Sequence, residues 1–103
     1  MQSDLEAWWA ALSADDVAPA AIKAKEYGSL DLKIIGSTMR GMIGIAPNIV
    51  SDEEIGIVFY QLGKIARAVS AIGSGRRPSD DTWHDMTVYS MMVRRVRDTG
   101  EWP

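Results

Sequence analysis

Two aspartates near the end of the chain, Asp81 and Asp85, have the residue type and the spacing to do chemistry. They are four residues apart, so on a helix they lie one turn apart on the same face. The same helical steps continue through Val88, Met92 and Val96, so the two carboxylates lead an apolar stripe. A buried carboxylate is unfavourable unless it is paired or binds a cation. We therefore expect both aspartates to face inward and to meet a positive partner.

The preceding segment supplies such partners in Lys64 and Arg67. Two interpretations are open. The aspartates pair with these cations in a network that only fixes helix register, or they bind Mg²⁺, which prefers carboxylate oxygens and retained waters. In the second case Lys64 and Arg67 hold phosphate oxygens. Tyr60 is typical of a core, although one tyrosine ring beside a nucleotide fits the same pattern.

Composition limits the class of protein. The chain has 103 residues, a net charge of −3, no cysteine and a single histidine, His84. Disulfides and thiolate metal sites are excluded, as is a multi-histidine zinc site within one chain. The negative charge argues against stable nucleic-acid binding. No apolar run approaches a membrane span and no signal-peptide pattern is present, so we expect a cytoplasmic protein that does not bind membranes.

Hydrophobic periodicity and capping patterns predict helices and no strand, over residues 4–12, 19–27, 30–43, 51–72 and 80–99. The link between the last two helices is short, so they should run antiparallel. We expect an all-α fold, a compact antiparallel bundle of four main helices plus a short N-terminal helix. It forms a single domain over 1–103, in which 1–17 is an N-terminal arm and 18–103 is the core.

The longest predicted helix, 51–72, has the strongest amphipathic pattern. Ser51 opens it with a capping box, as Ser3 does for the first helix. Glu53 and Glu54 lie in its first turn, where acidic residues are common. Its apolar residues recur at helical steps and are expected to form a core stripe, namely Ile55, Val58, Phe59, Leu62, Ile65, Ala66, Val69 and Ile72.

Glycines and one serine are expected to shape the middle of the chain. Gly28 should end the second helix in a left-handed conformation, and Ser29 should cap the third. Gly36 and Gly41 weaken the third helix, so they indicate close packing against a neighbouring helix. Residues 44–50, which include Pro47-Asn48, are expected to form a loop.

Three segments carry a recognisable pattern. Phe-Tyr-Gln-Leu-Gly-Lys-Ile-Ala-Arg (59–67) contains Lys-x-x-Arg, and Asp-Thr-Trp-His-Asp-Met-Thr-Val-Tyr (81–89) contains Asp-x-x-x-Asp-x-x-x-Tyr. Lys-Ala-Lys-Glu-Tyr-Gly (23–28) contains Lys-x-x-x-Tyr-Gly. Together they resemble small phage-encoded MazG-like proteins and the nucleotide-modification-associated domain. The resemblance covers residues 23–95.

The resemblance implies an all-α nucleoside triphosphate pyrophosphohydrolase, assembled as a homodimer or homotetramer. Such an enzyme uses Mg²⁺ to hydrolyse a nucleoside triphosphate to the monophosphate and pyrophosphate. A phage-encoded member acts in the host cytoplasm. The implied residue roles are metal binding by Glu53, Glu54, Asp81 and Asp85, catalysis by Glu54 and Asp85, and substrate binding by Lys64, Arg67, Tyr60 and Tyr89.

The sequence departs from the MazG-like pattern in both acidic motifs, which keeps a second function open. Glu54 is followed three residues later by Ile57 rather than by another glutamate, and Asp81 and Asp85 are four residues apart rather than three. The alternative is a non-catalytic MazG-like module that binds a nucleotide or a host protein. Its exposed contacts would be Trp8, Trp9 and Trp102. Of the two adjacent tryptophans, one is expected in the core and the other is available to a second subunit.

Overall fold

The computed structural model describes residues 4–44 and 49–103, and within them every regular element is a helix. The predicted all-α class is confirmed. The capping box expected at Ser3 and the loop expected at Pro47-Asn48 fall outside the described residues. In chain order the elements are α1 (Asp4–Leu12), the π-helix η1 (Ser13–Val17), α2 (Ala20–Ala24), α3 (Ser29–Ile43), α4 (Asp52–Gly73) and α5 (Asp80–Thr99).

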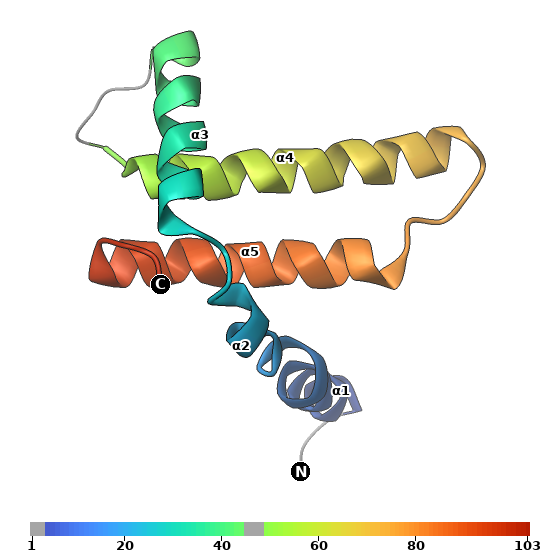
Figure 1. Cartoon of the computed structure of the whole chain (residues 1–103). Helices are drawn as coiled ribbons and strands as arrows, with labels where there is room; N and C mark the ends of the chain where they lie inside the picture. The colour runs from blue at the N-terminus through green and yellow to red at the C-terminus, as the bar shows by residue number, and fades with distance from the viewer. Residues whose placement is uncertain (1–3, 45–48) are drawn as a thin grey trace.

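The helices α4 and α5 form an antiparallel hairpin, as the short link between them predicted (Figure 1). The Ser51 hydroxyl accepts a hydrogen bond from the Glu54 N–H at 3.1 Å, so the predicted cap begins α4. Gly75 turns the connecting loop with a φ of 73°, a left-handed angle that glycine adopts without strain. The Gln61 side chain donates to the Met86 carbonyl at 2.9 Å, which fixes the register of the two helices.

The helix α3 crosses α4 where two glycines let the backbones touch (Figure 1). A Cβ on Gly36 would collide with the Asp52 carbonyl, and one on Gly56 would collide with the Leu32 carbonyl. The close packing expected at Gly36 is therefore confirmed, and Gly56 adds a contact that the sequence pattern did not predict. A Cβ on Gly41 would meet nothing within 4 Å, so the packing expected there is wrong. The reason is that Gly41 lies more than a turn beyond the crossing.

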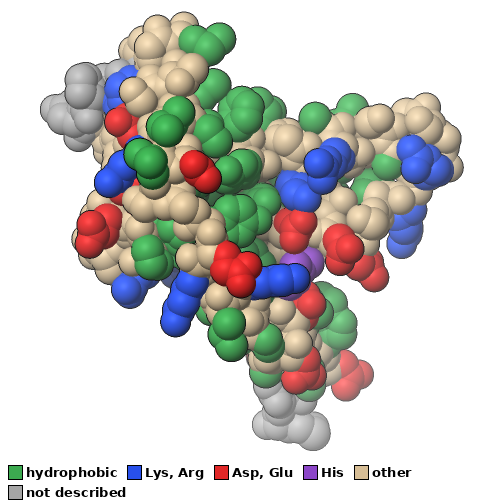
Figure 2. Space-filling model, in the orientation of Figure 1, with side chains coloured by type: hydrophobic (Ala, Val, Ile, Leu, Met, Phe, Trp, Pro, Cys, Tyr) green, Lys and Arg blue, Asp and Glu red, His purple; other side chains and the backbone are tan. Residues whose placement is uncertain are grey.

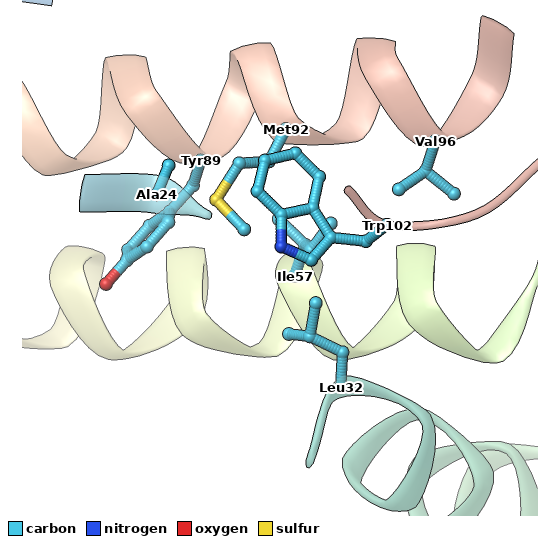
Figure 3. Close-up of a cluster of buried hydrophobic side chains, with 7 residues drawn as sticks. All are labelled: Ala24, Leu32, Ile57, Tyr89, Met92, Val96 and Trp102. Atoms are coloured by element: carbon cyan, nitrogen blue, oxygen red, sulfur yellow. The ribbon is translucent and has the colours of Figure 1, made fainter. Parts of the chain in front are cut away.

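A small core joins α2, α3, α4, α5 and the C-terminal tail (Figure 3). Its buried side chains are Ala24, Leu32, Ile57, Tyr89, Met92, Val96 and Trp102. The chain turns at Gly100 and folds back, so that the indole N–H of Trp102 donates to the Tyr27 carbonyl at 3.2 Å. Only 8% of Trp102 is exposed. The expectation that this tryptophan is an exposed contact is therefore wrong.

The junction between α2 and α3 also differs from the sequence-based prediction. The helix α2 ends at Ala24 rather than at Tyr27. Gly28 is extended, with φ −75° and ψ 126°, and is not the predicted left-handed stop. Ser29 begins α3 instead of capping it, because its hydroxyl donates to the buried Glu53 carboxylate at 2.9 Å. A tertiary contact has replaced the local cap.

The apolar stripe that was predicted to be the core side of α4 is largely exposed. Ile55 is buried. The following large residues of the stripe are between 42% and 64% exposed, namely Val58, Phe59, Leu62, Ile65, Val69 and Ile72. The opposite side of α4, which contains Gly56 and Ile57, packs inside instead. The stripe was identified correctly, but its assignment to the core of this chain is wrong.

The helices α1 and η1 form an N-terminal arm that projects from the α5 side of the hairpin (Figure 1). A hydrogen bond attaches it, since the Asp16 carboxylate lies 2.9 Å from His84 Nδ1. Trp8 and Trp9 are 58% and 65% exposed, so the expectation that one of them is buried is wrong. Their rings contact each other edge to face at a centroid distance of 6.2 Å.

In the part of the chain that the structure describes, one helix, α4, is long and apolar enough to cross a membrane by length and composition. This differs from the expectation that no segment approaches a span. The criterion alone is weak evidence, because core helices of soluble proteins also satisfy it. The side of α4 that packs inside carries Glu53 and Lys64, which are poorly suited to lipid.

Candidate functional site

A cavity of about 570 Å³ lies at the end of the helical hairpin, between the last turns of α4, the connecting loop and the first turns of α5. Figure 2 shows Lys and Arg side chains over this end of the molecule, with acidic side chains next to them. We call this cavity the basic cleft. Its charged lining consists of Lys64, Arg67, Arg76, Arg77, Asp81 and Asp85.

Lys64 and Asp85 form an ion pair across the cleft, with 2.7 Å between Nζ and Oδ2. The two side chains are 16% and 34% exposed, so the pair is partly shielded from water. The expectation that Asp85 meets a cation on the neighbouring helix is confirmed. Because the pair joins α4 to α5, it contributes to helix register whatever else it does.

Asp81 lines the same cleft but is exposed. The expectation that Asp81 faces inward at the head of a buried stripe is therefore wrong. It lies in the first turn of α5, whose first buried residue is the next one along the chain. The adjacent Thr82 is buried instead, and its hydroxyl lies 3.2 Å from the Ser79 hydroxyl. Asp81 is thus the carboxylate of the cleft that is most accessible to a ligand.

Arg67 is an exposed residue of α4 that lines the cleft, as the sequence indicated. Arg76 and Arg77 add two further guanidinium groups from the loop. A Gly-Ser-Gly-Arg-Arg-Pro turn favours solvation of both arginines, and both are exposed. The relevant pattern was their position in the turn, which carries them back toward Arg67. The cleft therefore holds more cations than carboxylates, an arrangement that favours an anionic ligand.

Glu53 does not reach the cleft, because it is buried at the other end of α4, where it organises the fold. Its Oε2 accepts hydrogen bonds from the Ser29 hydroxyl at 2.9 Å and from the Trp102 N–H at 2.6 Å. Its Oε1 lies 3.9 Å from Lys33 Nζ. These contacts explain how an acidic residue is tolerated in the interior.

Glu54 is half-buried and lines an apolar groove between α3 and α4. Ten residues separate it from Lys64, which corresponds to about 15 Å along a helix. The structure therefore does not bring Glu53 and Glu54 together with Asp81 and Asp85. Among the described residues, no group of three or more His, Asp or Glu side chains could hold a metal ion.

The donor set of the cleft limits the kind of metal site that it supports. Asp81 and Asp85 are its carboxylates, and Asp85 already pairs with Lys64. Two carboxylates are too few for a resident cluster of ions. They do suit a single Mg²⁺, which keeps several waters and shares its remaining positions with the phosphates of a substrate.

Tyr60 and Tyr89, which were predicted to contact substrate, form an aromatic cluster with Tyr27. Tyr60 and Tyr89 stack with ring centroids 5.7 Å apart, and the hydroxyls of Tyr27 and Tyr89 lie 3.0 Å from each other. Burial raises the pKa of Tyr27 to about 12, and its hydrogen bond with Tyr89 acts in the same direction. Burial also raises the pKa of Tyr60. The cluster is a structural element, and one of its edges is accessible.

That edge lines a second cavity of about 400 Å³, which we call the tyrosine cavity. Tyr27 and Tyr89 lie on its wall together with Lys23 and His84. Asp85 lines both this cavity and the basic cleft. The two cavities are therefore neighbours, and they offer one ligand a cationic and an aromatic environment. Tyr60 is not among the lining residues of either.

No protein-family model matches this chain, and neither a curated protein nor a solved structure matches it.

Proposed function

We propose that the protein binds a nucleoside triphosphate, as its Mg²⁺ complex, with the phosphates in the basic cleft. The observation that carries this proposal is the convergence of Lys64, Arg67, Arg76 and Arg77 on one cavity, from both α4 and the loop. Guanidinium groups bind phosphate oxygens through paired hydrogen bonds, and an ammonium group acts as a point charge. The accessible Asp81 gives a phosphate-bound Mg²⁺ a protein ligand.

The tyrosine cavity accommodates the nucleoside in this proposal. The half-buried Tyr27, with the buried Tyr89 behind it, offers aromatic surface for a base, and the cavity adjoins the basic cleft at Asp85. A nucleotide that spans both cavities therefore passes the Asp85 carboxylate. The arrangement fits the nucleotide-binding module of MazG-like type that the sequence suggested.

Hydrolysis to the monophosphate and pyrophosphate is the second candidate function. It is favoured by the position of Asp81 and Asp85 among the cations that would hold the phosphates. A bound Mg²⁺ supplies charge neutralisation and an activated water. In this version Lys64 exchanges its partner Asp85 for a phosphate oxygen and thereby frees the carboxylate. Glu53 and Glu54 take no part, because they lie at the far end of α4.

Calorimetric titration of the full chain with a panel of nucleoside triphosphates, with and without Mg²⁺, tests binding. Loss of a charged hydrogen bond to phosphate should make Arg67→Gln bind roughly tenfold more weakly or worse. Arg94→Gln is the matched control, since Arg94 is an exposed arginine of α5 outside the cleft. Binding that is absent in the wild type, or equal in both variants, contradicts the proposal.

Pyrophosphate release from the same panel separates the two functions. Hydrolysis predicts turnover that requires Mg²⁺ and is lost in Asp81→Asn, while circular dichroism shows unchanged helix content. Nucleotide binding without pyrophosphate release removes the hydrolase and leaves the binding module.

A further inference from the structure

We propose that the outer face of α4 is the interface between two copies of this chain. We define the outer face by its exposed apolar residues at helical spacing, namely Val58, Phe59, Leu62, Ile65, Val69 and Ile72. A contiguous exposed apolar patch of this kind marks an interaction site rather than ordinary surface. These residues do not line the basic cleft, so the inference does not rest on the proposed function.

The outer face points away from the rest of the hairpin. On the other side of α4, Lys64 contacts Asp85 of α5, and Gln61 donates to the Met86 carbonyl. Figure 2 shows apolar side chains along the edge of α4 that is remote from α5 and in the corner beneath α3. The chain therefore cannot cover the outer face with α5, which is already packed against the inner face.

The chain exposes more surface than a compact monomer of its size. Its accessible surface is 7394 Å² at a mass of 11.3 kDa, for which about 5,700 Å² is expected. Its Cα radius of gyration is 15.7 Å, compared with about 13 Å for a compact domain of this length. The excess surface, about 1,700 Å², is larger than the roughly 800 Å² that each partner contributes to a standard interface. The chain as a whole, the projecting arm of α1 and η1 included, therefore exposes enough surface for an interface of standard size.

The composition of the outer face favours a second copy as the occupant. Its six side chains are uncharged, and Glu54 is the one charged residue that lines the adjoining groove, so the face offers little of the charge pattern by which a different protein would be steered and selected. Interfaces of homodimers are more apolar than those of transient complexes. A regular apolar stripe also fits its own copy in a closed two-fold pair, in which the same patch is used twice.

We place the two α4 helices antiparallel. The helix α3 stands beside the first half of α4, and the two leave an apolar groove of about 390 Å³ lined by Met39, Ile43, Phe59 and Leu62. In an antiparallel pair, each groove receives the end of the other α4 that carries Ile72. A parallel pair would instead bring together two first turns rich in acidic residues, which repel.

Sedimentation velocity on the full chain measures the oligomeric state. We expect twice the monomer mass of 11.3 kDa for the wild type and the monomer mass for Leu62→Glu, with helix content unchanged by circular dichroism. Ile22→Glu is the matched control, because Ile22 is 76% exposed on α2, and this variant should remain dimeric. A monomeric wild type, or a dimeric Leu62→Glu, overturns the proposal. So does a monomer that instead binds phosphatidylcholine vesicles through Leu62.

Disulfide cross-linking tests the orientation. The chain has no cysteine, so a single introduced cysteine forms only intermolecular disulfides. In the antiparallel pair, a mixture of Val58→Cys and Ile72→Cys should give the mixed disulfide, whereas neither variant alone should cross-link efficiently. Ile22→Cys provides the background rate. Efficient cross-linking of each variant alone, or of no combination, overturns the arrangement.

Discussion

The two faces of α4 differ in composition and in what they contact. The inner face mixes Glu53, Gly56, Ile57, Tyr60 and Lys64, and each of these has a specific neighbour in α2, α3, α5 or the tail. The outer face is uniformly apolar, and beyond Ile55 the described part of the chain leaves it largely uncovered.

This contrast teaches that apolar character alone did not decide which side of α4 is buried. The inner face is the buried side of α4 because its residues make specific contacts with other segments of the chain. Gly56 admits the backbone of α3, Glu53 accepts the N–H of Trp102, and Lys64 pairs with Asp85. The outer face can pack against any apolar surface. It is therefore the face that remains available to another chain.

Replacing one isoleucine on each face of α4 by alanine should give the largest difference in the free energy of unfolding. Ile57 is fully buried, so Ile57→Ala should lower the free energy of unfolding by about 2–5 kcal/mol. Ile65 is 46% exposed, so in dilute solution Ile65→Ala should change it by less than about 1 kcal/mol. Urea denaturation at several protein concentrations measures both. The effect of Ile65→Ala should grow with concentration, because a second copy covers it, and equal losses at high dilution would refute the contrast.

Two glycines of α4 should respond in opposite directions to the same substitution. A Cβ at Gly56 would collide with the Leu32 carbonyl, so Gly56→Ala should destabilise the fold by about 1–3 kcal/mol. A Cβ at Gly63 would meet nothing within 4 Å, and Gly63→Ala should stabilise the helix by up to about 1 kcal/mol. Thermal denaturation of Gly56→Ala and Gly63→Ala should show a lower melting temperature for the first variant and a higher one for the second. Equal shifts would mean that α3 does not depend on close approach to α4.

Alanine substitution of the two neighbouring glutamates, Glu53 and Glu54, should lower the free energy of unfolding by different amounts. Glu53→Ala leaves the N–H of Trp102 and the hydroxyl of Ser29 without their buried acceptor, and should cost about 1.5–3 kcal/mol. Glu54→Ala should cost about 0.5 kcal/mol or less. Urea denaturation with and without Mg²⁺ is the measurement. A loss at Glu53 that depends on Mg²⁺ would return this residue to the set of metal ligands.

Alkaline pH should weaken the aromatic cluster that Tyr60 of the inner face forms with Tyr27 and Tyr89. The pKa of Tyr27 is raised to about 12 in the folded chain, against an ordinary value of about 10. Between these values the folded chain binds more protons than the unfolded chain, so the free energy of unfolding should fall as the pH rises. Urea denaturation between pH 9 and pH 12 should show a flatter profile for Tyr27→Phe. An identical profile would show that Tyr27 does not carry the effect.

The sequence by itself determined the three long helices, α3, α4 and α5, and the position of the hairpin. Ser51 begins α4, Gly100 ends α5 in a left-handed conformation, and the heptad-like spacing between Ile55 and Ile72 marks an amphipathic helix. These features are local, because capping and periodicity depend on residues within one or two turns. The spacing of Asp85 and the location of Lys64 also sufficed to place the two residues opposite each other, since a short link forces the two helices to run antiparallel, but left open whether they pair directly or bind a metal ion.

Only the tertiary structure decided which faces meet. Periodicity locates an apolar stripe but does not state what covers it, so it assigned Val58–Ile72 of the stripe to a core that the chain does not build around them. The burial of Trp102 and Glu53 depends on a hydrogen bond between residues 49 positions apart. Likewise, Arg76 and Arg77 join Arg67 because a turn returns them to the end of α4. Contacts between distant segments follow from how all the helices pack at once, and no local pattern records that.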